Sequence, residues 1–331
     1  MKSEQNQDPV KDPMDPRGRS RLPRMFGDLP TMLGGRPAFS PSEMEGLDVV
    51  FLGIPWEGTL TWGGFSGCEL ATKTIRQASA RYGTYLPEYD LDAGQILSLG
   101  DGGDLAVTPG DPEKTMSAIR AGLAEVYSSG ARPFIFGGDH STTPEAVAAL
   151  AERTRGRIGI LHLDAHLDNM PEYGDDPFAR CSPLHRIVNQ EGVRNSSVVH
   201  FGIRGPRNSP FQVRLAKESG ARLMTIREIR ERGFQEALNE ALDLVHQGTE
   251  AVFLTICSDI LDAAHNPGGP PDFNGLTSGE LMSLTYQTAA RGIMGMDFVE
   301  VYPPQDPLNR SSHLAVWAFI HALVGIAADG S

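Results

Sequence analysis

Cysteine is scarce in this sequence, and basic residues are outnumbered by acidic ones. The 331 residues include only three cysteines, Cys68, Cys181 and Cys257, and no pair of them has the CxxC spacing. Because an odd and sparse set of cysteines is not a disulfide framework, we expect free thiols in a reducing, cytoplasmic environment. Lys and Arg number 29 against 42 Asp and Glu, a formal net charge of −13. A surface of this charge repels a phosphate backbone, so we expect no nucleic acid partner.

A long apolar run is missing as well. The most apolar stretch, residues 313–328, is shorter than the ~20 residues that a membrane-spanning helix needs, and it contains His313 and His321. We interpret this stretch as a buried closing helix. The first ten residues, MKSEQNQDPV, lack the apolar segment of a signal peptide. We therefore expect no membrane partner.

Residues 1–46 differ in composition from the rest of the chain. They contain seven prolines, with Asp-Pro repeated at 8–9, 12–13 and 15–16. Proline lacks the backbone donor and fixes φ, so this segment is neither a helix nor a central strand. We predict an N-terminal arm, either disordered or laid across a neighbouring subunit, followed by one α/β domain over 47–331.

Short apolar segments alternate with amphipathic ones throughout 47–331. Strands that are apolar along their whole length are typical of a parallel sheet covered by helices on both faces. We expect strands near 47–55, 95–99, 133–136, 157–163, 197–203, 222–225, 251–257 and 292–301. We expect helices near 71–82, 113–129, 144–155, 234–247, 278–291 and 313–328.

Polar clusters follow four of these strands. In parallel α/β sheets, ligand sites lie at the carboxyl ends of the strands, so these clusters are expected to meet there. His162, which lies inside one of the buried strands, is interpreted as a core histidine. The clusters are GGDHS at 137–141, DAHLD at 164–168, CSDILD at 257–262 and FVEVYP at 298–303.

The DAHLD cluster has the spacing of a metal site. Asp164, His166 and Asp168 lie at i, i+2 and i+4, so on an extended segment they face one side. Without a cation, two carboxylates and an imidazole on one side are poorly compensated. This ligand chemistry suits Mn²⁺, Ni²⁺ or Fe²⁺. His140 and Asp259, from neighbouring strand ends, bring the candidate ligands to five, enough for two ions that activate a water.

These motifs, with GIRG at 202–205 and EVYP at 300–303, resemble the ureohydrolase superfamily of arginases, agmatinases and guanidine and biguanide hydrolases. The resemblance covers about 47–325. It implies a three-layer α/β/α fold with a mainly parallel eight-stranded sheet. It also implies a dinuclear Ni²⁺ or Mn²⁺ centre that hydrolyses a guanidine-type C–N bond of a cationic substrate. Carried over, the metal ligands are His140, Asp164, His166, Asp168 and Asp259. Glu300 would hold the guanidinium, and Asp168 would pass a proton to the leaving amine.

The sequence departs from the family at three places. Cys257 stands where the family has an aspartate that bridges both metals, and a thiolate offers one sulfur on a shorter arm, which Ni²⁺ tolerates better than Mn²⁺. Arg180 stands where the family has a histidine. Arginine stays protonated, and a like charge about 4 Å away costs about 4 kcal/mol at an effective dielectric of about 20. The loop 67–72, GCELAT, replaces a family loop at the site entrance.

Two functions follow from these departures. The first is a non-catalytic subunit that supports an active paralogue, similar to the supporting chain of a two-chain metformin hydrolase, in a hetero-oligomer such as a trimer or hexamer. In that case the chain itself holds a vestigial metal site or none. The second is a self-sufficient Ni²⁺- or Mn²⁺-dependent hydrolase of a guanidino compound, with Cys257 as an unusual ligand. A deacetylase-like relative is disfavoured, because those enzymes use a single zinc and other motifs.

Overall fold

The computed structural model describes residues 30–59, 61, 65–154 and 157–329. At its centre lies a nine-stranded sheet in which every neighbouring pair of strands is parallel, in the order β1-β5-β2-β6-β11-β10-β7-β8-β9. Its strands are β1 (Arg36–Pro37), β2 (Val49–Gly53), β5 (Leu99–Asp104), β6 (Arg132–Phe136), β7 (Ile158–Leu163), β8 (Val193–Ile203), β9 (Arg222–Thr225), β10 (Ala251–Cys257) and β11 (Gly295–Val299). A separate antiparallel hairpin pairs β3 (Tyr85–Leu86) with β4 (Leu91–Asp92).

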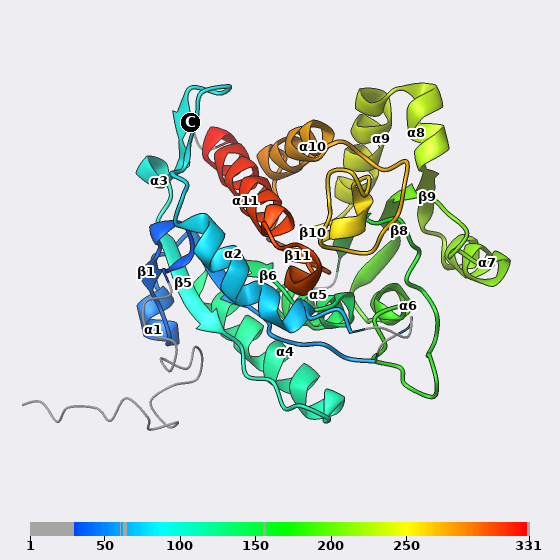
Figure 1. Cartoon of the computed structure of the whole chain (residues 1–331), viewed down its shortest axis with the longest axis horizontal. Coiled ribbons are helices and arrows are strands. Elements are labelled where there is room, and N and C mark those ends of the chain that lie inside the picture. Colours follow the sequence, from blue (N-terminus) through cyan, green and yellow to red (C-terminus); the bar gives the residue numbers. More distant parts are fainter. Residues whose placement is uncertain (1–29, 60, 62–64, 155–156, 330–331) are drawn as a thin grey trace, which may run out of the picture.

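Helices cover both faces of this sheet (Figure 1). One face carries α2 (Ala71–Ser79), α8 (Ile226–Arg232), α9 (Phe234–His246), α10 (Ser278–Ala290) and α11 (Arg310–Asp329). The other carries α1 (Pro41–Met44), α4 (Pro112–Ser129), α5 (Thr143–Arg153) and α6 (Pro183–Val188). The short α3 (Ala93–Ile96) lies near the hairpin and α7 (Pro210–Ser219) lies near β9. The three-layer α/β/α prediction is confirmed.

Alternate residues of each buried strand feed the two cores. In β2, Val49 and Phe51 join the core under α11, whereas Val50 and Leu52 join the core under α4. Because side chains on a strand alternate between faces, a strand that is covered on both sides must be apolar at every position. The same logic explains the apolar runs of β6, β7 and β10, which are buried along almost their whole length.

Strand β5 corrects the sequence prediction. We expected a strand at 95–99, but Ala93–Ile96 is a short helix and the strand runs over Leu99–Asp104, with the sequence LGDGGD. Its aspartates and glycines are typical of a loop, so the sequence did not indicate a strand here. In the fold both aspartates bind the buried guanidinium of Arg76 on α2, with Nε 2.9 Å from an oxygen of Asp101 and Nη1 2.5 Å from one of Asp104. A buried ion network therefore replaces apolar packing at this strand.

The sheet has nine strands rather than eight because part of the predicted arm joins it. Within residues 30–46, β1 pairs with β5, and Met32 and Met44 are fully buried. The Met32 N–H donates to Asp101 Oδ2 at 2.7 Å, which ties this segment to β5. Residues 1–29 of the predicted arm lie outside the described residues.

The apolar stretch near the C-terminus forms α11, a helix of 20 residues. Its length and composition would allow a membrane span, but 78% of its most apolar window is buried inside the structure. It packs between α2 and α10 (Figure 1). Burial of this kind is typical of a core helix, as the sequence analysis expected.

Candidate metal centre

Four neighbouring strands in the middle of the sheet, β6, β11, β10 and β7, end at one cluster of polar side chains. The GGDHS loop follows β6, Glu300 follows β11, Cys257 ends β10, and the DAHLD segment follows β7. Parallel strands bring their carboxyl ends to one edge, so residues more than a hundred positions apart in sequence meet there. The structure brings together all five candidate ligands.

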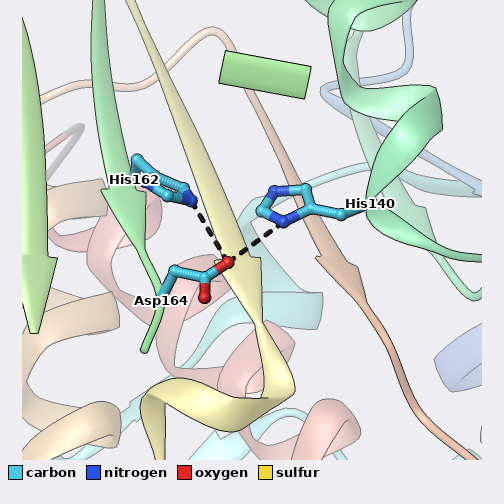
Figure 2. A group of neighbouring side chains, drawn as sticks. All are labelled: His140, His162 and Asp164. Atoms are coloured by element: carbon cyan, nitrogen blue, oxygen red, sulfur yellow. Dashed lines mark hydrogen bonds and ion pairs between the residues drawn. The ribbon is translucent and has the colours of Figure 1, made fainter. Parts of the chain in front are cut away.

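One half of the cluster is centred on His140. Its Nδ1 lies 3.1 Å from Asp164 Oδ2 and 3.2 Å from Asp168 Oδ2. Figure 2 shows the His140 and His162 rings pointing at the Asp164 carboxylate from two sides. The other ring nitrogen of His140, Nε2, is 2.9 Å from the Thr255 hydroxyl, which fixes the ring orientation.

The other half is centred on His166. Its Nδ1 lies 3.0 Å from Asp259 Oδ2 and 3.3 Å from Asp164 Oδ1. The second oxygen of Asp259 accepts the Ala165 N–H at 3.0 Å. On the far side of the ring, His166 Nε2 faces Asp272 Oδ2 at 3.2 Å. Asp164 therefore presents one oxygen to each half of the cluster.

The donor set fits a pair of divalent cations. His140 Nδ1 and Asp259 Oδ2 are buried without a well-aligned hydrogen-bond partner, although buried polar atoms are normally paired. Imidazole nitrogens and carboxylate oxygens that converge in this way are ligands of Mn²⁺, Fe²⁺ or Ni²⁺. The residues that could hold the two ions are His140, Asp164 and Asp168 in one half and His166, Asp164 and Asp259 in the other.

The surrounding carboxylates also raise the pKa values of His140 and His166. Burial lowers the pKa of His140, but the nearby carboxylates of Asp164 and Asp168 outweigh it and raise this pKa well above its usual value. For His166, burial again lowers the pKa, and the charge of Asp259 more than compensates. Metal binding at these rings therefore competes with protons.

Two histidines beneath the centre support its ligands, a role that the sequence did not predict. His162 is buried in β7, as expected of a core histidine, but its Nε2 lies 3.2 Å from Asp164 Oδ2. Its Nδ1 lies 2.9 Å from Nδ1 of His200 on β8. Burial lowers the pKa of His200 to about 3, so that ring is neutral, and its Nδ1–H can donate to Nδ1 of His162 while the Nε2–H of His162 donates to Asp164. Together the two rings orient the shared carboxylate.

Cys257 ends β10 beside Val299 of β11, two residues before Asp259, and is 2% exposed. Burial, followed by the charges of Asp164 and Asp259, raises the pKa of its thiol well above the usual value. The residue at this strand end is therefore a neutral thiol rather than an additional carboxylate.

Arg180 contacts carboxylates of the loops that border the candidate ligands. Its guanidinium lies against Glu300, with Nη1 3.1 Å from Oε2, and against Glu57, with Nη2 3.3 Å from Oε1. Burial lowers the pKa of Arg180, but Glu300 and Asp139 reverse that effect and raise it, so the side chain stays charged. The charge of Arg180 is therefore balanced by carboxylates that lie beside the candidate metal ligands.

The backbone around Glu300 is held in an uncommon conformation. Glu300 has φ 61° and Asp168 has φ 43°, in the left-handed region that non-glycine residues rarely occupy. The Glu300 N–H donates to the Gly138 carbonyl at 3.0 Å, and the His140 N–H donates to Glu300 Oε1 at 2.9 Å. Gly138 must be glycine, because a Cβ there would lie 2.7 Å from the Ile54 oxygen. These contacts lock together the loops after β6 and β11.

Comparisons with known proteins agree with this geometry. Residues 47–325 match the model of the arginase family. Guanidinopropionase of Pseudomonas aeruginosa is 31% identical, over 88% of this chain and 89% of that protein, and agmatinase of Bacillus subtilis is 28% identical, over 86% and 94%. The solved proclavaminate amidinohydrolase of Streptomyces clavuligerus superposes with a TM-score of 0.84 at 25% identity, covering 92% of this chain and 99% of that one.

A further solved relative shows the metal that the fold can hold. Formiminoglutamase of Trypanosoma cruzi, solved with Mn²⁺, superposes with a TM-score of 0.79 at 26% identity, covering 91% of this chain and 99% of that one. The parallel sheet, the polar cluster at its carboxyl edge and the match over most of the sequence lead to one conclusion. The chain belongs to the arginase family.

Proposed function

We propose that this chain is a ureohydrolase-family subunit that supports an active paralogue in the hydrolysis of a guanidine or biguanide C–N bond. Its similarity to guanidinopropionase and agmatinase supports a guanidino compound as the substrate class of the assembly. The metformin hydrolase type, a two-chain hetero-oligomer with Ni²⁺ or Mn²⁺, is the assembly that best matches a degenerate centre. The three free cysteines suit a cytoplasmic location.

Cys257 carries this proposal. Asp164 is the carboxylate that presents oxygens to both halves of the centre, at 3.1 Å from His140 Nδ1 and 3.3 Å from His166 Nδ1. A second bridging carboxylate would provide further oxygen ligands to both ions. Cys257 supplies instead a single sulfur on a shorter side chain. Hard cations such as Mn²⁺ prefer oxygen, so we expect the pair of ions to be held weakly.

The second candidate is a self-sufficient hydrolase, and the convergence of all five remaining ligands favours it. Two bound divalent ions would supply Lewis acidity and lower the pKa of water. In that case Glu300 would orient the substrate guanidinium, and Asp168 would move a proton to the leaving amine. Glu300 could bind a substrate only after Arg180 moves, because their side chains are 3.1 Å apart.

Metal stoichiometry of the isolated chain tests the proposal. The purified wild type, Cys257→Asp and Cys257→Ser are loaded separately with Ni²⁺ and Mn²⁺ and desalted, and metal per chain is counted by mass spectrometry. We expect almost no retained metal in the wild type and the serine variant. The aspartate variant should bind Mn²⁺ at least about tenfold more tightly, the effect of about 1.4 kcal/mol from one added oxygen ligand.

The serine variant is the matched control, because it changes the same buried position without adding a carboxylate. A wild-type chain that retains about two ions, as a dinuclear hydrolase should, and by itself releases urea or ammonia from a guanidino compound would establish the second candidate instead.

A further inference from the structure

The guanidinium of Arg180 lies in a pocket built from acidic and hydroxyl side chains of three separate segments. The arginine side chain is 5% exposed, and Glu300 and Asp139 beside it are 4% and 0% exposed. Arg180 itself comes from the turn before α6, whereas its partners come from the loops after β2, β6 and β11. The pocket is therefore formed by the tertiary structure and not by local sequence.

The contacts surround both terminal nitrogens. Nη1 lies 3.1 Å from Glu300 Oε2 and 3.3 Å from the Tyr302 hydroxyl. Nη2 lies 3.3 Å from Glu57 Oε1 and 3.5 Å from Asp139 Oδ2. Each nitrogen thus faces at least one carboxylate from a different segment.

The partners are themselves held in place. The Tyr302 hydroxyl donates to Glu300 Oε2 at 2.6 Å, and the Gly58 N–H donates to Asp139 Oδ2 at 2.7 Å. The Ser66 and Gly67 N–H groups each donate to Glu57 at 3.0 Å. The geometry of the pocket does not depend on Arg180 alone, so it should persist when that side chain is shortened.

Such a pocket selects the shape and the charge of a guanidinium. A planar cation with donors on several edges can serve carboxylates on different sides at once, whereas an ammonium acts as a point charge. The two buried carboxylates of Asp139 and Glu300, with the partly buried Glu57, would repel one another strongly without a cation. Arg180 supplies the cation that balances these carboxylates.

We propose that this pocket is a guanidinium-binding site that the chain keeps filled with Arg180, so that it is closed to free guanidino compounds. Removing the Arg180 side chain beyond Cβ opens a space the length of a short alkylguanidinium. The chain without Arg180 then becomes a receptor for that class of ligand. This occupancy does not depend on whether the chain binds metal or turns over substrate.

Binding of small probes to Arg180→Ala tests the proposal. Ethylguanidinium is titrated by calorimetry and by thermal unfolding into metal-free protein kept in chelator, with ethylammonium matching the charge and urea matching the planar shape. We expect ethylguanidinium to bind the variant at least tenfold more tightly than the wild type, with little binding of the other two probes. The bound probe should also raise the unfolding temperature of the variant.

Two further variants isolate the site. Arg186→Ala removes an arginine from the next helix, where it pairs with Glu145, and should leave ethylguanidinium binding at the wild-type level. Adding Glu300→Gln to Arg180→Ala removes one carboxylate from the pocket and should weaken ethylguanidinium binding at least tenfold. If Arg180→Ala folds poorly, the added Glu300→Gln also reduces the repulsion between the remaining carboxylates of the pocket.

If Arg180→Ala is unfolded alone, refolding is measured with each probe present, and recovery with ethylguanidinium but not with ethylammonium supports the proposal. Equal binding by wild type and variant overturns it, and so does a variant that stays unfolded with every probe. Metal retention by the wild type would contradict the proposed function and leave these outcomes unchanged, so the two failures can be told apart.

Discussion

The acidic side chains around the centre are balanced in three different ways. Asp164 and Asp259 face imidazole rings, and Glu300 faces a guanidinium. Glu57 and Glu69 form a carboxyl–carboxylate pair, in which one proton is shared. Each arrangement avoids a bare buried carboxylate, which would be costly in a medium of low dielectric constant.

The shared proton gives a pH dependence that can be measured. Burial and the hydrogen bond that Glu69 donates to Glu57 raise the pKa of Glu69 to about 7, above its ordinary value of 4.5. The folded chain therefore holds a proton that the unfolded chain releases, and the free energy of unfolding should fall as pH rises from about 4.5 to about 7. Glu69→Gln should remove this part of the fall.

Urea unfolding of both proteins at pH 5 and pH 8 checks this expectation. The difference between the two pH values should be smaller in Glu69→Gln than in the wild type, and Glu88→Gln, an exposed glutamate, should behave as the wild type. Parallel pH profiles of wild type and Glu69→Gln would contradict the shared proton.

At the scale of single elements, helices with clear caps were the easiest to predict. The helices expected at 113–129 and 278–291 are Pro112–Ser129 and Ser278–Ala290. Asp111 caps the first, and Thr277 with Glu280 forms a capping box at the second. The position of strand β5 was predicted wrongly. Its aspartates are compatible with burial only because Arg76, on a separate helix, pairs with them.

The capping box of α10 gives a prediction for this element. The Thr277 hydroxyl accepts from the Glu280 N–H at 3.2 Å, and Glu280 accepts from the Thr277 N–H at 2.9 Å. Thr277→Ala should lower the free energy of unfolding by about 1 kcal/mol, because one backbone donor loses its partner. Urea denaturation measures the change, and Ser278→Ala in the same helix is the control. An equal loss in both variants would show that the cap contributes nothing specific.

At the scale of the whole molecule, the sheet order places the four site-bearing strands next to one another. β11 enters between β6 and β10 although it is the last strand of the chain. This insertion brings Glu300 beside the GGDHS loop, where it accepts the His140 N–H. The site is complete only when the last strand has joined the sheet.

The proposed supporting role predicts an association that purification can reveal. A tagged copy of this chain, recovered from its own source, should carry with it a second arginase-family chain that has an intact Asp-x-Asp-x-x-Asp motif. In the proposed role, the chain contributes to hydrolysis through such an assembly. A tag on the second chain should recover the same pair in the same ratio, and recovery of an active homo-oligomer would contradict the role.

Local patterns along the chain were enough to predict the fold class, the strand ends that carry the polar clusters and the five candidate ligand positions that meet there. This was possible because apolar strands and the residues directly after them are local patterns, and parallel strands bring their ends to one edge. The contacts of Arg180 could be seen only in the folded chain, since Glu57 and Glu300 lie more than a hundred residues away on either side. The sequence also did not predict the contacts of Asp272 with His166 and of His200 with His162, because these residues lie far apart along the chain. Contacts between distant loops depend on packing in three dimensions, and no spacing along the chain encodes them.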